Sequence, residues 1–248
     1  MTDVPAVRAF VACATGYVGR SVVAALRARG IETVAHVRSD STRLADWTAH
    51  FGQLGATVDG TPWNDADMTA RLRELRPTLV FALLGTTKAR AQAAARSGAP
   101  ASDYDTVDYG LSAQLLRAAQ ACPATPKFVY LSAAGVAEGT TSAYLAARVR
   151  LERELRASGL HFIIARPSFI TGDDREENRP VERLLARLVD LSMSVAGAFG
   201  ARSLQQRWAS LTGGALAQSL VRLGLDPAEV NRVVYADELR VAHPISGR

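Results

Sequence analysis

Short apolar runs alternate with longer amphipathic segments between residue 9 and residue 165. An apolar run of about four to eight residues without polar alternation is typical of a parallel strand buried on both faces. A longer segment with apolar residues three or four positions apart is typical of a helix that covers such a sheet. Strands are predicted over residues 9–12, 33–37, 56–58, 79–84, 127–131 and 161–165. Helices are predicted between the first two strands and over residues 41–54, 65–75, 105–121 and 142–158.

This alternation predicts an α/β fold with a doubly wound, parallel, Rossmann-like sheet. The pattern changes after residue 170, where a charged stretch over residues 172–180 precedes several helical segments. Those segments are residues 181–195, 213–223 and a short one near Asp237. The apolar residues expected to pack there as a small, mostly helical cap are Phe199, Trp208 and Leu211. We predict a dinucleotide-binding domain over residues 1–170 and a C-terminal substrate or cap segment of the same domain over residues 171–248.

The turn after the first strand carries the strongest functional signal. It contains Gly16 and Gly19 in the spacing of a dinucleotide-binding turn, between a predicted strand and a predicted helix. Such a turn lets backbone N–H groups and the helix N-terminus approach a pyrophosphate closely. Cys13 holds the place of the first glycine, so we expect a negative φ there or a slightly remodelled turn. The residues expected to bind the cofactor here are Cys13, Thr15, Gly16, Tyr17, Val18 and Gly19.

The end of the second strand indicates which dinucleotide binds. NAD-binding proteins usually carry Asp or Glu there for the ribose 2′-hydroxyl, whereas this chain has Arg38 followed by Ser39. A guanidinium suits a 2′-phosphate, so NADP(H) is preferred. Asp40 keeps NAD(H) open, and a solvated surface arginine is the structural alternative for Arg38. Nearby, Trp47 is expected to pack in the core.

Other predicted cofactor contacts follow the later strands, because ligands of a doubly wound sheet sit at the strand carboxyl ends. The fourth strand ends at a leucine that is followed by a glycine and two threonines (L-G-T-T). A proline and a serine come soon after the sixth strand. Asp108 lies on the first turns of the helix over residues 105–121 and is expected to face the cofactor. The residues assigned here are Leu84, Gly85, Thr86, Thr87, Asp108, Pro167 and Ser168.

Three side chains form a candidate catalytic group. Tyr144 and Arg148 are four residues apart on one predicted helix and share a face, and Ser132 ends the preceding strand. The phenol of Tyr144 could exchange a proton with a carbonyl oxygen, with Arg148 as the neighbouring cation. Ser132 could hydrogen-bond the substrate oxygen. By itself, Tyr144 would more simply be a half-buried helix tyrosine.

The same residues resemble the short-chain dehydrogenase/reductase superfamily in its atypical branch. The motifs that carry the resemblance are the T-G-Y-V-G turn, L-L-G-T-T, Asp108-Tyr109, Tyr130 to Ser132, Tyr144-x-x-x-Arg148 and Arg166-Pro167. Asp174-Arg175 and Arg179-Pro180 add a similarity to the Tat-interacting-protein-like oxidoreductase subgroup. The resemblance implies that the tyrosine is the acid/base, that the serine orients substrate, and that a lysine four residues after the tyrosine binds the nicotinamide ribose. Cys13 and Arg148 depart from the family pattern.

Composition narrows the remaining classes. The net charge of +5 comes with only two lysines among 29 basic residues, and the arginines are spread evenly, so no nucleic-acid-binding patch is indicated. Two cysteines give no disulfide framework, and the four histidines show no metal-ligand spacing. No apolar run has transmembrane length and no signal peptide is recognised, so a cytoplasmic location without membrane partners is expected.

Two functions fit these residues. The first is an NADP(H)-dependent oxidoreductase that reduces a carbonyl or oxidises an alcohol of a small-molecule substrate. The second is a non-catalytic NADP(H)-binding protein that senses redox state or acts as a scaffold, because the same fold serves both uses. The resemblance also implies a homodimer formed by the helices over residues 105–121 and 142–158.

Overall fold

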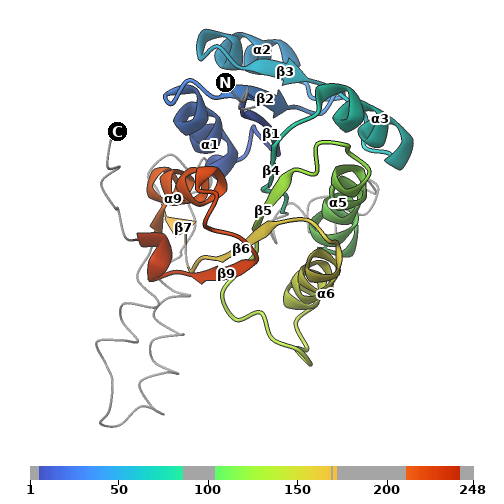
Figure 1. The fold of residues 1–248 in the computed structure, drawn as a ribbon, viewed down its shortest axis with the longest axis vertical. Helices are drawn as coiled ribbons and strands as arrows, with labels where there is room; N and C mark the ends of the chain where they lie inside the picture. Colours follow the sequence, from blue (N-terminus) through green and yellow to red (C-terminus); the bar gives the residue numbers. More distant parts are fainter. Residues whose placement is uncertain (1–5, 86–103, 169, 172–210, 241–248) are drawn as a thin grey trace, which may run out of the picture.

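A seven-stranded parallel sheet forms the centre of the protein (Figure 1). The computed structural model describes residues 6–85, 104–168, 170–171 and 211–240. The strands are β1 (Arg8–Ala12), β2 (Glu32–His36), β3 (Thr57–Asp59), β4 (Leu79–Ala82), β5 (Lys127–Leu131), β6 (Phe162–Arg166) and β9 (Arg232–Tyr235). Their spatial order is β3-β2-β1-β4-β5-β6-β9, and all neighbouring pairs run parallel. The predicted Rossmann-like α/β class is confirmed, and the strand order reverses between β1 and β4.

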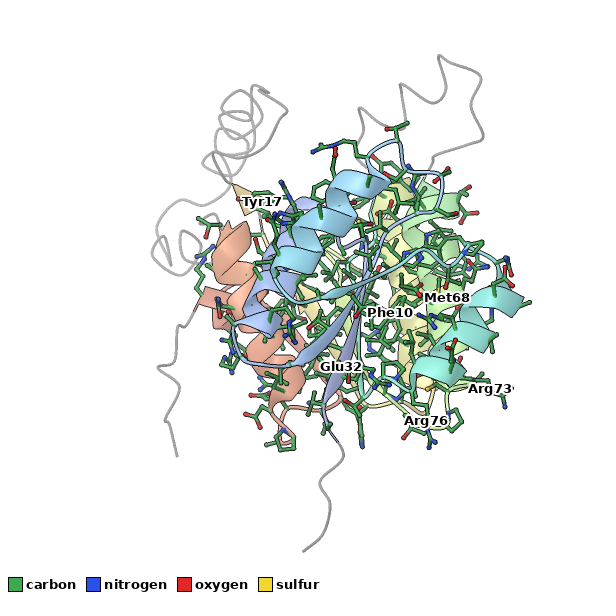
Figure 2. The ribbon with its side chains drawn as sticks, turned by 90° about the horizontal axis from the view of Figure 1, so that it is seen from above. Phe10, Tyr17, Glu32, Met68, Arg73 and Arg76 are labelled. Carbon is green, nitrogen blue, oxygen red and sulfur yellow. The ribbon has the colours of Figure 1, made fainter. Side chains whose placement is uncertain are left out.

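Helices cover both faces of this sheet and enclose two apolar layers. Those described are α1 (Tyr17–Arg27), α2 (Leu44–Gln53), α3 (Asp65–Leu75), α5 (Ser112–Gln120), α6 (Ala143–Ala157) and α9 (Gly213–Leu225). Helices α1, α2 and α9 pack on one face, and α3, α5 and α6 pack on the other. Phe10 of β1 lies at the middle of the molecule, facing the α3 layer that contains Met68 (Figure 2). Burial of these faces provides the main stabilisation of the fold.

The C-terminal segment contributes a strand and a helix to the central fold. The sequence predicted six strands, but Arg232–Tyr235 adds a seventh, β9, beside β6. Helix α9 confirms the predicted helix over residues 213–223 and packs mainly on α1. A short 3₁₀ helix, η2 (Glu238–Arg240), stands where a terminal helix was predicted. Leu211 lies in β8 (Leu211–Thr212), which pairs with β7 (Ile170–Thr171), whereas Phe199, Trp208 and the segment over residues 181–195 lie outside the described residues.

Two predicted helices begin differently from the sequence pattern. The helix predicted from Ser41 begins at Leu44, and no side chain caps it. The helix predicted over residues 105–121 is a π-helix, η1 (Tyr104–Leu111), followed by α5. Both changes occur next to the candidate site, and π-helical turns are frequent at such positions. Within the described ranges, no helix is both long enough and apolar enough to cross a membrane.

Candidate functional site

A cavity of about 470 Å³ opens at the carboxyl ends of β1, β2 and β4, where the strand order reverses. This is the position at which open α/β sheets bind ligands, and the volume is within the range of small-molecule sites. Cys13 and Thr15 reach it from the turn after β1, and Leu84 and Gly85 reach it from the end of β4. The other lining residues are Arg20, His36, Val37, Arg38, Ser41, Thr42, Arg43, Trp47, Trp63, Val107 and Leu111.

The turn between β1 and α1 is closely packed. The Gly16 N–H donates to the Cys13 carbonyl at 3.0 Å and closes the turn. A Cβ on Gly19 would lie 2.1 Å from the Cys13 carbonyl oxygen, so only glycine fits there. Cys13 has φ = 62°, in the left-handed region. The prediction that the cysteine would avoid a positive φ is therefore wrong. Cys13 keeps the backbone conformation of the glycine that it replaces, which is strained for a residue with a side chain.

One wall of the cavity is strongly basic. Arg20 of α1 and Arg38 and Arg43 of the loop between β2 and α2 line it, and none of the lining residues in the described part of the chain is an aspartate or glutamate. Asp40 is paired with Arg38 at 3.6 Å, but both side chains are largely exposed, and Asp40 is not among the described residues that line the cavity. A wall with three guanidinium groups and no carboxylate suits an anionic ligand.

His36 at the end of β2 and Trp63 after β3 form an aromatic wall of the cavity. His36 is 2% exposed, its Nε2 lies 2.8 Å from the Thr61 carbonyl oxygen, and its ring contacts the edge of Trp63 at 4.8 Å. Burial lowers the pKa of His36 more than the hydrogen bond with Thr61 and the charge of Asp59 raise it. The neutral imidazole therefore donates through Nε2 to the Thr61 carbonyl, and the cavity gains no cation from His36.

Arg148 lies just beyond Gly85 and is enclosed in a buried network. Its guanidinium donates to the Tyr130 hydroxyl at 3.1 Å, to the carbonyls of Leu131 and Leu84, and to Asp108 at 2.6 Å. The side chains of Arg148 and Asp108 are 5% and 0% exposed. Burial raises the pKa of the Tyr130 phenol to about 12, although Arg148 opposes this. Arg148 joins the ends of β4 and β5 to η1, and these atoms are not available to a ribose in this arrangement.

Tyr144 lies above this network on the first turn of α6. The centre of its ring is 5.2 Å from the Arg148 guanidinium carbon, and the Tyr104 ring contacts it at 5.2 Å. The side chain is half-buried, and within the described part of the chain its hydroxyl has no hydrogen-bond partner. Tyr144 and Arg148 are thus brought together as predicted, and the Tyr144 hydroxyl can still donate or accept a hydrogen bond.

Ser132 is turned toward a different partner. Its hydroxyl donates to Glu152 at 2.6 Å, and Glu152 also accepts from Arg166 and Arg156. Burial alone would raise the pKa of Glu152, but hydrogen bonds from Arg166 and Ser132 and the Arg166 charge lower it overall. Because the only Ser132 proton points to a fixed carboxylate, the serine faces a ligand as a hydrogen-bond acceptor.

The other predicted residues fall into four groups. Gly16, Tyr17, Val18 and Gly19 shape the turn, and Tyr17 accepts from the Gly213 N–H, where α9 meets α1 (Figure 2). Asp108 was expected to face the cofactor but is fully buried against Arg148, because the π-helical turn directs it inward. Ser39 is exposed, Pro167 accepts from Ala134, and Ser168 accepts from Arg240. Thr86 and Thr87 lie outside the described residues.

Sequence reasoning missed several lining residues. Arg20, Arg43 and Trp63 were not selected, and Trp47 was assigned to the core. Trp47 is half-buried: it packs on the core and also lines the cavity. The available signal was the cluster of hydroxyl and guanidinium groups over residues 41–43 so soon after Arg38. The predicted helical start at Ser41 obscured it.

A family model for NAD(P)H-binding proteins matches residues 13–196. The chain belongs to this NAD(P)H-binding family. The resemblance to the short-chain dehydrogenase/reductase superfamily is confirmed at the level of an NAD(P)-binding Rossmann family, and the Tat-interacting-protein-like subgroup stays a prediction. The cavity described above therefore belongs to an NAD(P)H-binding protein.

Relatives and solved structures agree with this family. "Protein fmp52-1, mitochondrial" from Aspergillus terreus is 28% identical over 226 residues, which cover 89% of this chain and 88% of the relative. AtPrR2, solved with NADP⁺ and (+)-pinoresinol, has a TM-score of 0.63 at 15% identity and covers 92% of this chain and 69% of that one. WbmH from Bordetella bronchiseptica, solved with NAD⁺, has a TM-score of 0.60 at 18% identity and covers 92% and 74%. At these identities the structures show the fold alone.

The names of the relatives correct one expectation. Four relatives from Aspergillus species are named mitochondrial, which contradicts the predicted cytoplasmic location. The prediction was a default that followed from recognising no signal peptide and no transmembrane segment in the sequence.

Proposed function

We propose that this protein is an NADP(H)-dependent oxidoreductase that interconverts a carbonyl compound and an alcohol. The observation that carries the proposal is the continuity of the site. Gly85 lines the cavity, its Cβ position is 2.8 Å from an Arg148 nitrogen, and the Tyr144 ring lies over that guanidinium. The proposed dinucleotide site would therefore adjoin a half-buried phenol at the carboxyl edge of the sheet.

The residues of the cavity fit a phosphorylated dinucleotide. Gly19 keeps the turn closely packed at the N-terminus of α1, where a pyrophosphate would bind, and the three arginines, with no carboxylate among the described lining residues, favour a 2′-phosphate over a free 2′-hydroxyl. Thr15, Arg38 and Gly85 would contact the bound cofactor. When bound, NADPH supplies a hydride for a carbonyl carbon.

Tyr144 is the residue proposed to move the proton. In the direction of reduction, its hydroxyl donates a proton to the carbonyl oxygen while the carbonyl carbon gains the hydride, and an alcohol results. The Arg148 guanidinium lies against the Tyr144 ring and would hold the phenol in place for this transfer. Ser132 would orient the substrate by accepting a hydrogen bond, because Glu152 holds its proton.

A non-catalytic NADP(H)-binding function remains the second candidate because one observation favours it. Arg148 and Ser132 are both bound to buried acidic partners, so two of the three candidate catalytic groups already have structural roles. In this case the protein would bind NADP(H), show no turnover, and contact a partner in a manner that depends on the redox state of the cofactor.

The two functions separate in one set of measurements. Titration of the protein with NADPH and NADH, followed by fluorescence, tests cofactor binding in the wild type and Arg38→Ala. Turnover with a panel of aldehydes and ketones then tests Tyr144→Phe, which should lose at least about a hundredfold in kcat while NADPH affinity stays unchanged. Equal turnover by the Tyr144→Phe variant would refute the catalytic role. NADPH binding without any turnover supports the second function.

A further inference from the structure

The π-helix η1 and helix α6 meet through two pairs of side chains beside the proposed site of proton transfer. Tyr104 and Asp108 lie on η1, whereas Tyr144 and Arg148 lie on α6. The buried pair is ionic, with Arg148 donating to Asp108 at 2.6 Å. The outer pair is aromatic, and the ring centres of Tyr104 and Tyr144 are 5.2 Å apart with their planes at 61°. The ion pair therefore joins the two elements that carry the two phenols.

The same π-helix also borders the cavity proposed to bind the cofactor. Val107 and Leu111 of η1 line this cavity, and a Cβ on Gly85 would lie 3.4 Å from a carboxylate oxygen of Asp108. A substrate that lies between the cavity and Tyr144 would therefore lie against η1, the element that carries Tyr104.

Reduction of a carbonyl places negative charge on its oxygen, and hydrogen-bond donors aimed at that oxygen stabilise the charge. Tyr144 is one such donor in the proposed reaction. Ser132 is not a second one, because its proton is held by Glu152 at 2.6 Å. The two terminal nitrogens of Arg148 each donate to two protein atoms, which uses all of their protons. A second donor to the substrate oxygen must therefore come from outside the predicted catalytic group.

The hydroxyl of Tyr104 is a donor without a hydrogen-bond partner in the described part of the chain. The side chain is half-buried, and burial and the charge of Asp108 raise the pKa of the phenol. The Tyr104 hydroxyl therefore keeps its proton at neutral pH and can donate it in a hydrogen bond. By contrast, the hydroxyl of Tyr109, on the same π-helix, already donates to Glu154 at 2.6 Å.

We infer that Tyr104 donates a hydrogen bond to the same substrate carbonyl oxygen that Tyr144 protonates. This inference rests on the proposed function, because it adds a second catalytic residue to that reaction. In reduction, the carbonyl carbon gains the hydride as NADPH is oxidised to NADP⁺, and the Tyr144 proton moves to the oxygen to give the alcohol. Tyr104 keeps its own proton and stabilises the negative charge on the oxygen until that transfer is complete.

The test follows NADPH oxidation by absorbance, on the full chain, with the panel of aldehydes and ketones. Tyr104→Phe keeps the ring and removes the hydroxyl, so it should lower kcat about ten- to a hundredfold and leave the Kd for NADPH unchanged. Tyr109→Phe is the matched control, because it removes a hydroxyl from the same π-helix that binds Glu154 instead, and its kcat should equal that of the wild type. Ser132→Ala should lower kcat less than Tyr104→Phe, because the serine proton is held by Glu152.

A further variant, Tyr104→Leu, separates the hydroxyl from the ring. A loss of kcat in Tyr104→Leu but not in Tyr104→Phe would assign Tyr104 a packing role against Tyr144 and overturn the inference. A larger loss in Ser132→Ala than in Tyr104→Phe would assign the second donor to Ser132 and overturn it as well.

The failure of this inference can be told apart from the failure of the proposed function. Full activity of Tyr104→Phe, with Tyr144→Phe inactive, overturns the role of Tyr104 and leaves the oxidoreductase proposal standing. Absence of turnover by the wild type with every member of the panel refutes the oxidoreductase proposal, and the role of Tyr104 with it.

Discussion

Cys13 adopts a backbone conformation that is unfavourable for a residue with a side chain. Its φ of 62° lies in the left-handed region, which costs about 1–2 kcal/mol for L-residues other than glycine. We predict that Cys13→Gly raises the free energy of unfolding by about 1 kcal/mol, measured by urea denaturation. Cys13→Ala is the control because it removes the thiol and keeps the strain. Equal stability of the two variants would show that the cysteine is not strained.

Gly19 gives the opposite prediction in the same turn. A Cβ there would lie 2.1 Å from a backbone oxygen and 2.9 Å from the Cα of Ala14, and backbone atoms cannot give way cheaply. Gly19→Ala should destabilise the protein by about 2 kcal/mol and abolish NADPH binding. Gly52→Ala is matched to it: Gly52 lies in α2 with open space around its Cβ position. That substitution should stabilise the protein by about 0.5–1 kcal/mol. Equal effects of the two substitutions would contradict the packing argument.

For single residues, the sequence predicted the position of the cofactor turn but not the local conformation or the distant partners of its neighbours. The glycine spacing was enough to place the cofactor turn, because glycine is required wherever two backbone segments approach this closely. The spacing could not show that Cys13 keeps a glycine-like φ, since a hydrogen bond between Gly16 and Cys13 closes the turn and outweighs the local preference. The partners of Asp108 and Ser132 are 40 and 20 residues away in sequence, and only the fold brings them together.

The π-helix η1 contacts α6 through one buried ion pair and through more exposed side chains. Inside, Asp108 binds Arg148; outside, Tyr109 donates to Glu154 and the Arg150 guanidinium lies 3.7 Å from the centre of the Tyr109 ring. Consecutive residues 108 and 109 thus contact residues 148 and 150 on the buried and exposed sides of α6. A regular 3.6-residue helix is what the sequence pattern predicts, and the extra residue of a π-turn leaves no mark in that pattern.

The inner contact should dominate the stability of this element. Removing one partner of a fully buried ion pair leaves an uncompensated charge, so Asp108→Asn should cost about 3–5 kcal/mol of unfolding free energy. Arg150→Met, at an exposed ion pair of the same two elements, should cost less than about 1 kcal/mol. Urea denaturation of both variants checks this difference. A double variant, Asp108→Asn with Arg148→Met, should cost less than the sum of its single variants because the pair acts together.

At the scale of the whole molecule, the sheet was predictable because each buried strand carries its own apolar run. Strand β9 was missed because Val233 and Val234 form only a short apolar pair between Arg232 and Tyr235. Its position depends on pairing with β6 and on packing of α9 against α1, and neither is local in sequence. The same limit applies to the cavity: its basic wall combines α1 with the loop before α2, so single-element patterns identified Arg38 alone.

The buried carboxylate of Glu152 gives the molecule a pH dependence. It connects β5, α6 and β6 through Ser132, Arg156 and Arg166. Burial opposes ionisation, but the hydrogen bonds and the Arg166 charge hold the folded-state pKa of Glu152 below its ordinary 4.5. A depressed pKa means that the unfolded chain takes up the proton first as the pH falls. The stabilisation is therefore complete above pH 4.5 and is lost as the pH falls through the folded-state pKa.

Replacing the Glu152 carboxylate by an amide measures how much this residue contributes to the pH dependence of the free energy of unfolding. At neutral pH, Glu152→Gln should be less stable than the wild type by about 3 kcal/mol, because Arg166 loses its buried partner. Urea denaturation from about pH 7 to about pH 3 should show the two free energies of unfolding converging on the acid side. Other carboxylates with lowered pKa values, such as Asp59, titrate in both proteins and cancel in the difference. A constant gap across this pH range would mean that Glu152 stabilises the fold by packing alone, and that Ser132 is not fixed by its charge.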